Sequence, residues 1–549
     1  MKAFTEPLLS LAGFEEMTKT AEKSSGLISV TGCIDAQKSQ MIYAFGGHRK
    51  NKLIVTFGEQ KAKELYDEYS FFDKEVVYYP SKDVLFYQSD IRGNLLTAER
   101  IRALKAIHEQ ESVTLVTTFD ALMNTMAPIE KMWENVLTLE QGQLLDLKEI
   151  QAALIRMGYE KEYQVQTMGQ FSVRGGILDV FPLTEENPIR IELWGDEIDT
   201  IRYFDCESQK SIENTDRVSI YPAAELVLSD EEKAGGIEKL KAEAKRVSDK
   251  LRKQMKTEEA HRVTVMADEL TEEWGELSMY AGMDAFLSYF FDERVGLLDY
   301  FKPSDSLIFF DELTRCTEQG KLTETEFSES MKQRLAMGYI LPGQMNGLFT
   351  EKEIVAKLGK YSCIALAALD NKANGLHQLG SYGIHCQSVS PYNNSFELLI
   401  KDLKRYKKNG YRVILLSGSR TRAKRLSEDI TDQGITCFYT ENYDHELFEG
   451  QIMVCYGKVR RGFEYPILKF AVITESDIFG AQQKKKKRHR TYEGEKIQSF
   501  TDLSVGDYVV HENHGLGIYR GIEKLEVDKK VKDYIKIEYQ GCLLYTSPS

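Results

Sequence analysis

The stretch "VTGCIDAQKSQ", residues 30–40, follows an apolar segment and decides the fold of the N-terminal region. It matches the phosphate-loop pattern G-x-x-x-x-G-K-[ST] at Gly32, Lys38 and Ser39. Gln37 stands where the pattern requires a second glycine, which lets the backbone pass beneath the phosphates without a β-carbon. The stretch therefore predicts a nucleotide-binding fold that is retained around a degenerate loop, with an active ATP site as the alternative.

Two acidic features bear on this choice. Asp35, inside the loop, would set a carboxylate against a phosphate anion, which is unfavourable by about 1 kcal/mol or more. Far downstream, the apolar segment SLIFFDEL ends in Asp311 and Glu312, where a Mg²⁺-binding acid and a catalytic acid of a nucleotide site would lie. Buried strands often end in acidic residues, so this second pattern agrees with both interpretations.

Apolar strand-like segments alternate with helical segments on both sides of the loop. In residues 1–134 this alternation predicts a mostly parallel, doubly wound α/β sheet, in which ligands bind at the carboxyl ends of strands. Residues 227–392 begin with a helix that Ser229 and Glu232 open as a capping box, followed by three strand-like segments that could complete the same sheet: 305–313, 361–369 and 383–391. Residues 135–226 are then a β-rich insertion in one interrupted domain.

Composition restricts the class of protein. The chain has 549 residues, too many for one core, and 42% of them are hydrophobic. Its net charge of -14 opposes nucleic acid, so DNA contact requires a local basic patch and protein partners are the first expectation. The eight cysteines are scattered without metal-ligand spacing, which predicts a reducing cytoplasm, and no apolar run is long enough to span a membrane. We expect a cytoplasmic monomer.

Period-two alternation organises the inserted segment. It places Ile189, Ile191 and Leu193 on a buried face of one strand. The opposite, outward face carries Arg190, Glu192 and Trp194, and Arg174 on a neighbouring strand could join it. Arginine and tryptophan are enriched at interface hot spots, so this face is a candidate protein-binding surface. In the alternative, Trp194 caps the edge of the sheet and Arg190 forms a salt bridge with Glu192.

Three further parts follow. Residues 393–480 read as a second, small α/β domain, whose turn SGSRTR could hold an anion or serve packing alone. Residues 481–500 form a linker that is solvated or contacts phosphates non-specifically through its basic run: Lys484, Lys485, Lys486, Lys487, Arg488 and Arg490. Residues 501–549 read as a partial SH3-like barrel, in which His511 and His514 shape turns because no other ligands complete a metal site.

At this point the order of parts resembles the N-terminal half of the bacterial transcription-repair coupling factors, over residues 1–541. The motifs that carry the resemblance are RGGILDVFP, RIELWGDEID, GFEYPILKFAVITESDIFG and VGDYVVHENHGLGIYRGIEKLEV. The first two also resemble UvrB. The tail CLLYTSPS does not resemble the family, so the barrel is expected to be incomplete.

The resemblance implies a UvrB-like module without helicase activity, a family-specific α/β domain, a linker, and a Tudor-like domain that binds the β subunit of RNA polymerase. In the family the inserted domain recruits UvrA, and its contact residues fall on Arg174, Arg190 and Trp194, while polymerase contacts fall on Ile522 and Leu525. The family's ATP, Mg²⁺ and most DNA contacts belong to a translocase motor beyond the matched residues, so we expect no cofactor here. A UvrB-like NTPase using Lys38, Ser39 and Asp311, and a DNA-binding module using the basic run, are the alternatives.

Overall fold

A computed structural model describes residues 1–46, 49–82, 94–276, 283–369, 374–480, 506–511, 515–527, 530–539 and 542–546. The described residues up to 480 form one compact unit, and those from 506 onward belong to a second. Among the described helices, none is long and apolar enough to cross a membrane.

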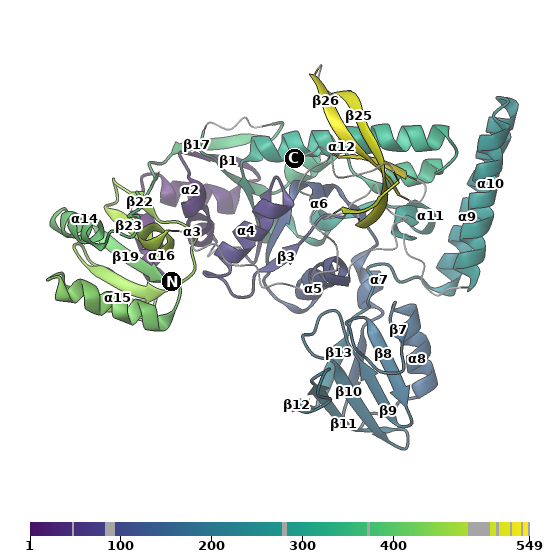
Figure 1. The fold of residues 1–549 in the computed structure, drawn as a ribbon, viewed down its shortest axis with the longest axis horizontal. Coiled ribbons are helices and arrows are strands. Elements are labelled where there is room, and N and C mark those ends of the chain that lie inside the picture. Colours follow the sequence, from purple (N-terminus) through teal and green to yellow (C-terminus); the bar gives the residue numbers. More distant parts are fainter. Residues whose placement is uncertain are drawn as a thin grey trace. The chain divides into compact units, whose positions relative to one another are not determined.

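The N-terminal unit is built on a seven-stranded sheet whose neighbours all pair in parallel (Figure 1). Its strands, in spatial order, are β17 (Gln378–Gly383), β1 (Gly26–Thr31), β16 (Ser362–Leu366), β15 (Ser306–Asp311), β2 (Asn51–Thr56), β4 (Thr114–Thr118) and β3 (Val77–Tyr79). The central strands are buried along nearly their whole length, as expected when both faces of a parallel sheet are covered. The helices that follow β1 and β2 are α3 (Asp35–Phe45) and α4 (Glu59–Tyr69).

The sheet contains strands from both sides of the insertion. β15 and β16 lie beside β1 and β2, which confirms the prediction for residues 305–313 and 361–369. The prediction for residues 383–391 was wrong. The remaining strand of this sheet is β17, which ends at Gly383, and the next strand, β18 (Gln387–Ser388), joins another sheet. Hydrophobic periodicity alone does not show which of the two short neighbouring strands, β17 or β18, joins this sheet.

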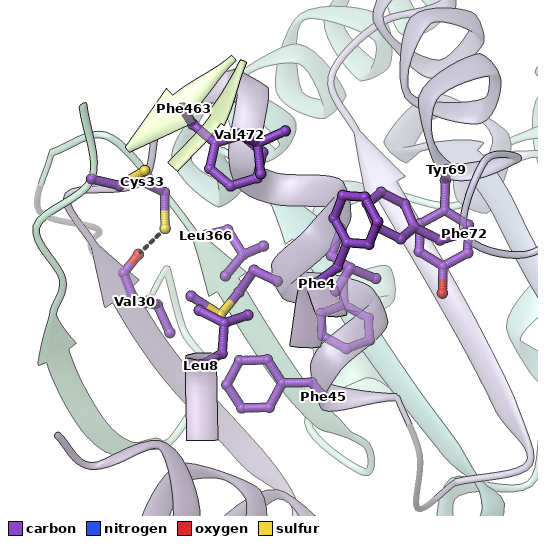
Figure 2. Close-up of a cluster of buried hydrophobic side chains, with 14 of the residues drawn as sticks. Phe4, Leu8, Val30, Cys33, Phe45, Tyr69, Phe72, Leu366, Phe463 and Val472 are labelled. Atoms are coloured by element: carbon purple, nitrogen blue, oxygen red, sulfur yellow. Dashed lines mark hydrogen bonds between the residues drawn. The ribbon is translucent and has the colours of Figure 1, made fainter. Parts of the chain in front are cut away.

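Residues 387–480 form a six-stranded sheet whose core is continuous with the first. In spatial order its strands are β18, β22 (Phe463–Tyr465), β23 (Phe470–Thr474), β19 (Arg412–Ser417), β21 (Ile452–Tyr456) and β20 (Phe438–Tyr439), flanked by α14 (Phe396–Lys408) and α15 (Arg420–Asp432). One buried cluster unites Phe4 of the N-terminal helix α1 (Lys2–Leu9), Phe45 and Leu366 with Phe463 and Val472 of this sheet (Figure 2). The two α/β layers therefore pack as one body at this seam.

A buried acid at the same seam gives a pH dependence. Burial raises the pKa of Glu68 on α4 to about 7, from a usual value near 4.5, and the nearby Lys61 and Arg460 offset this only in part. Because the folded pKa lies above the unfolded one, the charged carboxylate destabilises the fold increasingly as pH rises from about 4.5 to about 7. We expect Glu68→Gln to raise the free energy of unfolding at pH 8 by on the order of 1–3 kcal/mol and to change it little at pH 4. Urea unfolding at the two pH values measures the difference; equal effects at both would contradict it.

The insertion is a β-rich module. Its main sheet has the order β12 (Ser211–Thr215), β11 (Glu197–Phe204), β10 (Ile189–Trp194), β9 (Ile177–Val180), β8 (Gln170–Arg174) and β7 (Glu160–Lys161). Its own core includes Ile189, Ile191 and Ile201, and β6 (Leu137–Glu140) pairs with β13 (Arg217–Ile220) beside it. The helix α8 (Leu147–Arg156) belongs to this module.

A buried ionic cluster fixes the point where the chain leaves the module. Glu225 accepts hydrogen bonds from Arg100 Nε at 2.7 Å and Nη2 at 3.0 Å, and forms an ion pair with Lys82 at 3.0 Å. Burial alone would raise the pKa of Glu225, but the two cations outweigh it and lower the pKa to about 2. Arg100 lies on α5 (Asn94–Glu109), so this cluster ties the end of the insertion to the α/β core.

The predicted capped helix is confirmed as α9 (Asp230–Lys253), which pairs with α10 (Thr257–Glu276). Ser229 and Glu232 form both hydrogen bonds of the capping box. Gly236, which weakens helix propensity, has a packing reason: a β-carbon there would lie 2.3 Å from the ring of Phe290.

The described residues of the C-terminal unit form four antiparallel strands that pair in chain order. They are β24 (Tyr508–His511), β25 (Gly515–Val527), β26 (Lys530–Tyr539) and β27 (Cys542–Thr546). Residues 542–546 lie beyond the resemblance found in the sequence, yet they form a strand against β26. Closure of this sheet into a barrel stays a prediction.

Candidate functional site

The loop between β1 and α3 is shorter than its sequence suggests. The sequence predicts a helix from about Ser39, but α3 begins at Asp35, so Gly32, Cys33 and Ile34 alone join strand to helix and Gln37 lies inside the helix. Gly32 has a φ of +78°, and a β-carbon there would lie 2.0 Å from the Ile384 carbonyl oxygen. The glycine is required here for a close approach of protein backbone.

Lys38 and Asp311, 273 positions apart, meet as the sequence predicts, but in a closed cluster. The Lys38 ammonium donates to Asp311 Oδ1 at 2.6 Å, Glu312 Oε1 at 2.8 Å and Asp35 Oδ1 at 3.2 Å. An ammonium has three hydrogens, so three carboxylates use its donors fully. Asp311 Oδ2 in turn accepts from the Thr56 hydroxyl at 2.9 Å.

Burial and charge act in opposite directions on this lysine. Its side chain is 1% exposed, and burial alone would lower its pKa, but the charges and hydrogen bonds of Asp311 and Glu312 outweigh burial and raise the pKa. The lysine therefore stays charged and remains bound to its own carboxylates. A phosphate could take its donors only by removing the ammonium from the buried Asp311 carboxylate, which is costly.

One side chain from the second sheet, that of Tyr465, bonds the start of α3. Tyr465 donates through its hydroxyl to Gln37 Oε1 at 3.1 Å and lies 3.3 Å from Gln40 Oε1, while Gln40 Nε2 donates to the Phe4 carbonyl at 2.5 Å. Gln37, Lys38 and Ser39 are all buried. Gln37, the residue that departs from the phosphate-loop pattern, thus forms a hydrogen bond with the second sheet.

We expect the chain to show no binding of Mg·ATP at millimolar concentration, because the lysine donors and the loop space are occupied by protein. Thermal unfolding with and without Mg·ATP measures this. A rise in unfolding temperature that grows with nucleotide concentration would contradict it and favour the NTPase alternative.

In the second α/β layer, too, the candidate anion-binding turn is bonded to a carboxylate of the chain itself. The turn after β19 donates to Glu475 Oε2 from the Ser417 hydroxyl at 2.9 Å and from the Gly418 amide at 2.6 Å, and Arg422 pairs with Glu475 as well. Glu475 follows β23, the strand beside β19. The anion that this turn could hold is therefore a carboxylate of the chain itself, which supports the packing interpretation of SGSRTR.

The outward face of the β-rich module has a different character. Arg190 donates to both Asp179 oxygens, from Nε at 2.7 Å and Nη2 at 2.8 Å, and Arg174 donates to Asp179 Oδ2 at 2.8 Å. Arg190 also donates to Gln209 Oε1 at 2.9 Å and lies over the Phe204 ring at 4.3 Å. These bonds place two guanidinium groups side by side, and one buried carboxylate offsets only one of their charges.

Ile189 and Ile191 are buried, as the period-two alternation predicts. Two other residues of this strand differ from the expectation. Leu193 is half-buried, because the β10–β11 register shifts between Glu192 and Leu193. Arg190 lies on the outer face, yet its side chain is only 13% exposed because it lies flat against Asp179 and Phe204. The alternative pairing of Arg190 with Glu192 was wrong, since Glu192 bonds Arg202, with Nη1 to Oε2 at 2.9 Å.

Trp194 lies on the same strand as Arg190, four residues further along the chain. It ends β10, an interior strand, just before the turn at Gly195, and it is 85% exposed, so it does not cap a sheet edge. An exposed indole and two arginines on the outward face of one sheet are residue types enriched at protein-binding hot spots. Arg174, at 37% exposure of its side chain, extends the same surface onto β8.

The remaining predicted sites are placed only in part. Ile522 and Leu525 lie on β25, opposite Ile535 and Lys532 of β26. The basic run Lys484–Arg490 lies outside the described residues. In the part of the chain that is described, no group of three or more His, Cys, Asp or Glu side chains is arranged to hold a metal ion.

Three residues that form contacts in the candidate sites were not predicted from the sequence: Asp179, Glu475 and Tyr465. Asp179 could have been suspected, because it is an acid within the apolar strand ILDV, but its position opposite Arg190 depends on strand register. Glu475 resembles Asp311 in following a buried apolar strand, and that signal was available. Tyr465 had no local signal, since its role depends on how the two sheets pack.

Comparisons with known proteins agree with this division. The family described as UvrB interaction domain matches residues 137–226, and the family described as CarD-like/TRCF RID domain matches residues 503–545. The transcription-repair-coupling factor of Bacillus subtilis (strain 168) is 30% identical over 491 residues, covering 89% of this chain and 41% of that protein. Those of Staphylococcus haemolyticus (strain JCSC1435) and Staphylococcus aureus (strain USA300) are 29% and 28% identical, covering 94% and 96% of this chain and 44% of each relative. The chain spans less than half the length of these relatives.

Proposed function

We propose that this chain, which belongs to the transcription-repair coupling factor family, supplies the recruiting part of that family's role in transcription-coupled nucleotide excision repair. The β-rich module binds UvrA through Arg174, Arg190 and Trp194. The C-terminal unit, as a small Tudor-like barrel that includes Ile522 and Leu525, binds the β subunit of RNA polymerase. The α/β layers hold the two binding surfaces on one chain and hydrolyse no nucleotide.

The observation that carries this proposal is the arginine pair on Asp179, together with the exposed Trp194 on the same strand as Arg190. The pair is preorganised, because Asp179 is 1% exposed and holds both guanidinium groups before any partner arrives. An exposed indole costs little conformational entropy to immobilise and offers a large contact area. The match of residues 137–226 to the UvrB interaction domain supports placing the partner surface in this module.

The loop after β1 and the turn after β19 support the proposal that these layers neither bind nor hydrolyse a nucleotide. Both turns that could hold a phosphate are bonded to carboxylates of the chain, through Lys38 in one layer and through Gly418 and Arg422 in the other. An NTPase would need at least one of these to be open.

Calorimetric titration of the chain with UvrA, with the Trp194→Ala variant in parallel, tests the proposal. The unmodified chain should bind at micromolar affinity or tighter, and the variant should lose about 2 kcal/mol, roughly thirtyfold in affinity. Trp194 supports no core, so the variant should keep its unfolding temperature. Absence of binding by the unmodified chain would overturn the proposal.

A further inference from the structure

A cleft of about 680 Å³ opens on the other flank of Trp194. The segment Glu140–Gly142, the start of β11 and the start of β13 form it, and the lining includes Trp194, Glu197, Asp199 and Asp216. Backbone hydrogen bonds fix its walls: Gly142 N donates to Ile198 O at 2.8 Å, and Gln141 N donates to Asp216 O at 2.9 Å. The cleft is thus part of the folded module.

A β-bulge aims the acidic side chains of this cleft. Glu192 pairs with Thr200, but Leu193 pairs with Ile198, so β11 carries one extra residue, Asp199. Bulges re-aim side chains and are enriched next to functional sites. Glu197 and Asp199 are exposed, while Ile198 between them is buried.

The charge of the cleft is unbalanced. Four carboxylates line it, from Glu140, Glu197, Asp199 and Asp216, against one guanidinium, from Arg217. Arg217 pairs with Glu140 at 3.2 Å. Within the described part of the chain, no ion pair is recorded for the other three carboxylates.

Apolar surface frames these carboxylates. Leu144, which forms a β-bridge with Glu197, is 75% exposed, and Trp194, the cross-strand partner of Glu197, is 85% exposed. Two large exposed apolar side chains therefore flank one acid. This is a surface for a ligand with an apolar stem and a cationic end, since a cation binds the face of an indole and a carboxylate at once.

We propose that this cleft receives an arginine side chain of the partner that docks on Arg174 and Arg190, so that Trp194 is shared between two halves of one interface with opposite charge. This inference rests on the proposed function. Charge complementarity and continuity support it: Arg190 and Trp194 are four residues apart on β10, about 13 Å, well within one standard interface. Arg174 and Arg190 would bind an acidic patch on the partner, and the acidic cleft would bind a basic patch next to it. Two patches of opposite charge fix the orientation of docking.

The test compares two triple variants in titrations with UvrA. The cleft variant carries Glu197→Gln, Asp199→Asn and Asp216→Asn. The matched control carries Glu160→Gln, Glu162→Gln and Glu207→Gln, which remove the same charge from exposed positions of the same module. The cleft variant should bind about tenfold more weakly or worse, through a loss of at least about 1.4 kcal/mol, while the control binds like the unmodified chain.

The outcomes separate the two proposals. Equal affinity of the cleft variant and the unmodified chain, with binding still lost in Trp194→Ala, would overturn the cleft and leave the proposed function standing. Absence of UvrA binding by the unmodified chain would overturn both. Tighter binding of both triple variants would mean that net charge alone governs the interaction, and this too would overturn the cleft.

Discussion

Replacing Lys38 by methionine is expected to destabilise the N-terminal unit by about 3–5 kcal/mol, the cost of leaving a buried charge without its partner. Asp311 is 1% exposed and its oxygens bond Lys38 and Thr56, so removal of the ammonium leaves its charge buried at the carboxyl end of β15 without the lysine that offsets it. Methionine keeps the volume of the side chain, so lost packing contributes little. Urea unfolding measures the change.

The matched control is Lys19→Met. Lys19 pairs with Glu15 on the surface, and the two side chains are 62% and 80% exposed, so we expect its loss to change the free energy of unfolding little. Equal costs for the two substitutions would contradict the closed cluster and show that the Lys38 pocket is open to solvent.

Reversing the charge at Arg190 is the second large effect that we expect. Arg190→Glu should weaken UvrA binding by about 2 kcal/mol or more, roughly thirtyfold, because it removes a preorganised cation and places a second carboxylate beside Asp179. Calorimetric titration measures the affinity. Arg156→Glu, an equal charge change on an exposed position of α8, should bind like the unmodified chain.

A conservative variant guards against a folding defect in Arg190→Glu. Arg190→Lys keeps the charge next to Asp179 but cannot make the two parallel bonds to its carboxylate, so the module should stay folded while affinity falls by a smaller factor. If Arg190→Lys and Arg190→Glu both bind UvrA as tightly as the unmodified chain, the arginine pair is not part of the interface.

The sequence predicted those parts of the fold that depend on local pattern. The alternation around "VTGCIDAQKSQ" predicted the parallel sheet, and the strand-end position of Asp311 predicted that it would meet Lys38. Both follow from one rule, that parallel strands end at the same edge of a sheet. The single departure at Gln37 was also informative, since that side chain lies buried where a phosphate loop is open.

The rest depended on register and packing, which a single sequence does not encode locally. Gly32 lies against Ile384, which follows the neighbouring strand β17 but is far away in the sequence, so local pattern did not predict this contact. Asp179 meets Arg190 because β9 and β10 pair in one register of several that the pattern allows. The cleft beside Trp194 depends on a β-bulge at Asp199, and no glycine or other turn residue at that position indicates the bulge in the sequence.

The most direct test of the central claim is hydroxyl-radical labelling of the chain alone and in saturating UvrA. Trp194 is 85% exposed, whereas Trp274 is fully buried, and Met255, 87% exposed between α9 and α10, serves as an internal reference. The account predicts that UvrA suppresses labelling of Trp194 and leaves Met255 unchanged. A complex in which Trp194 stays as reactive as in the free chain would contradict it.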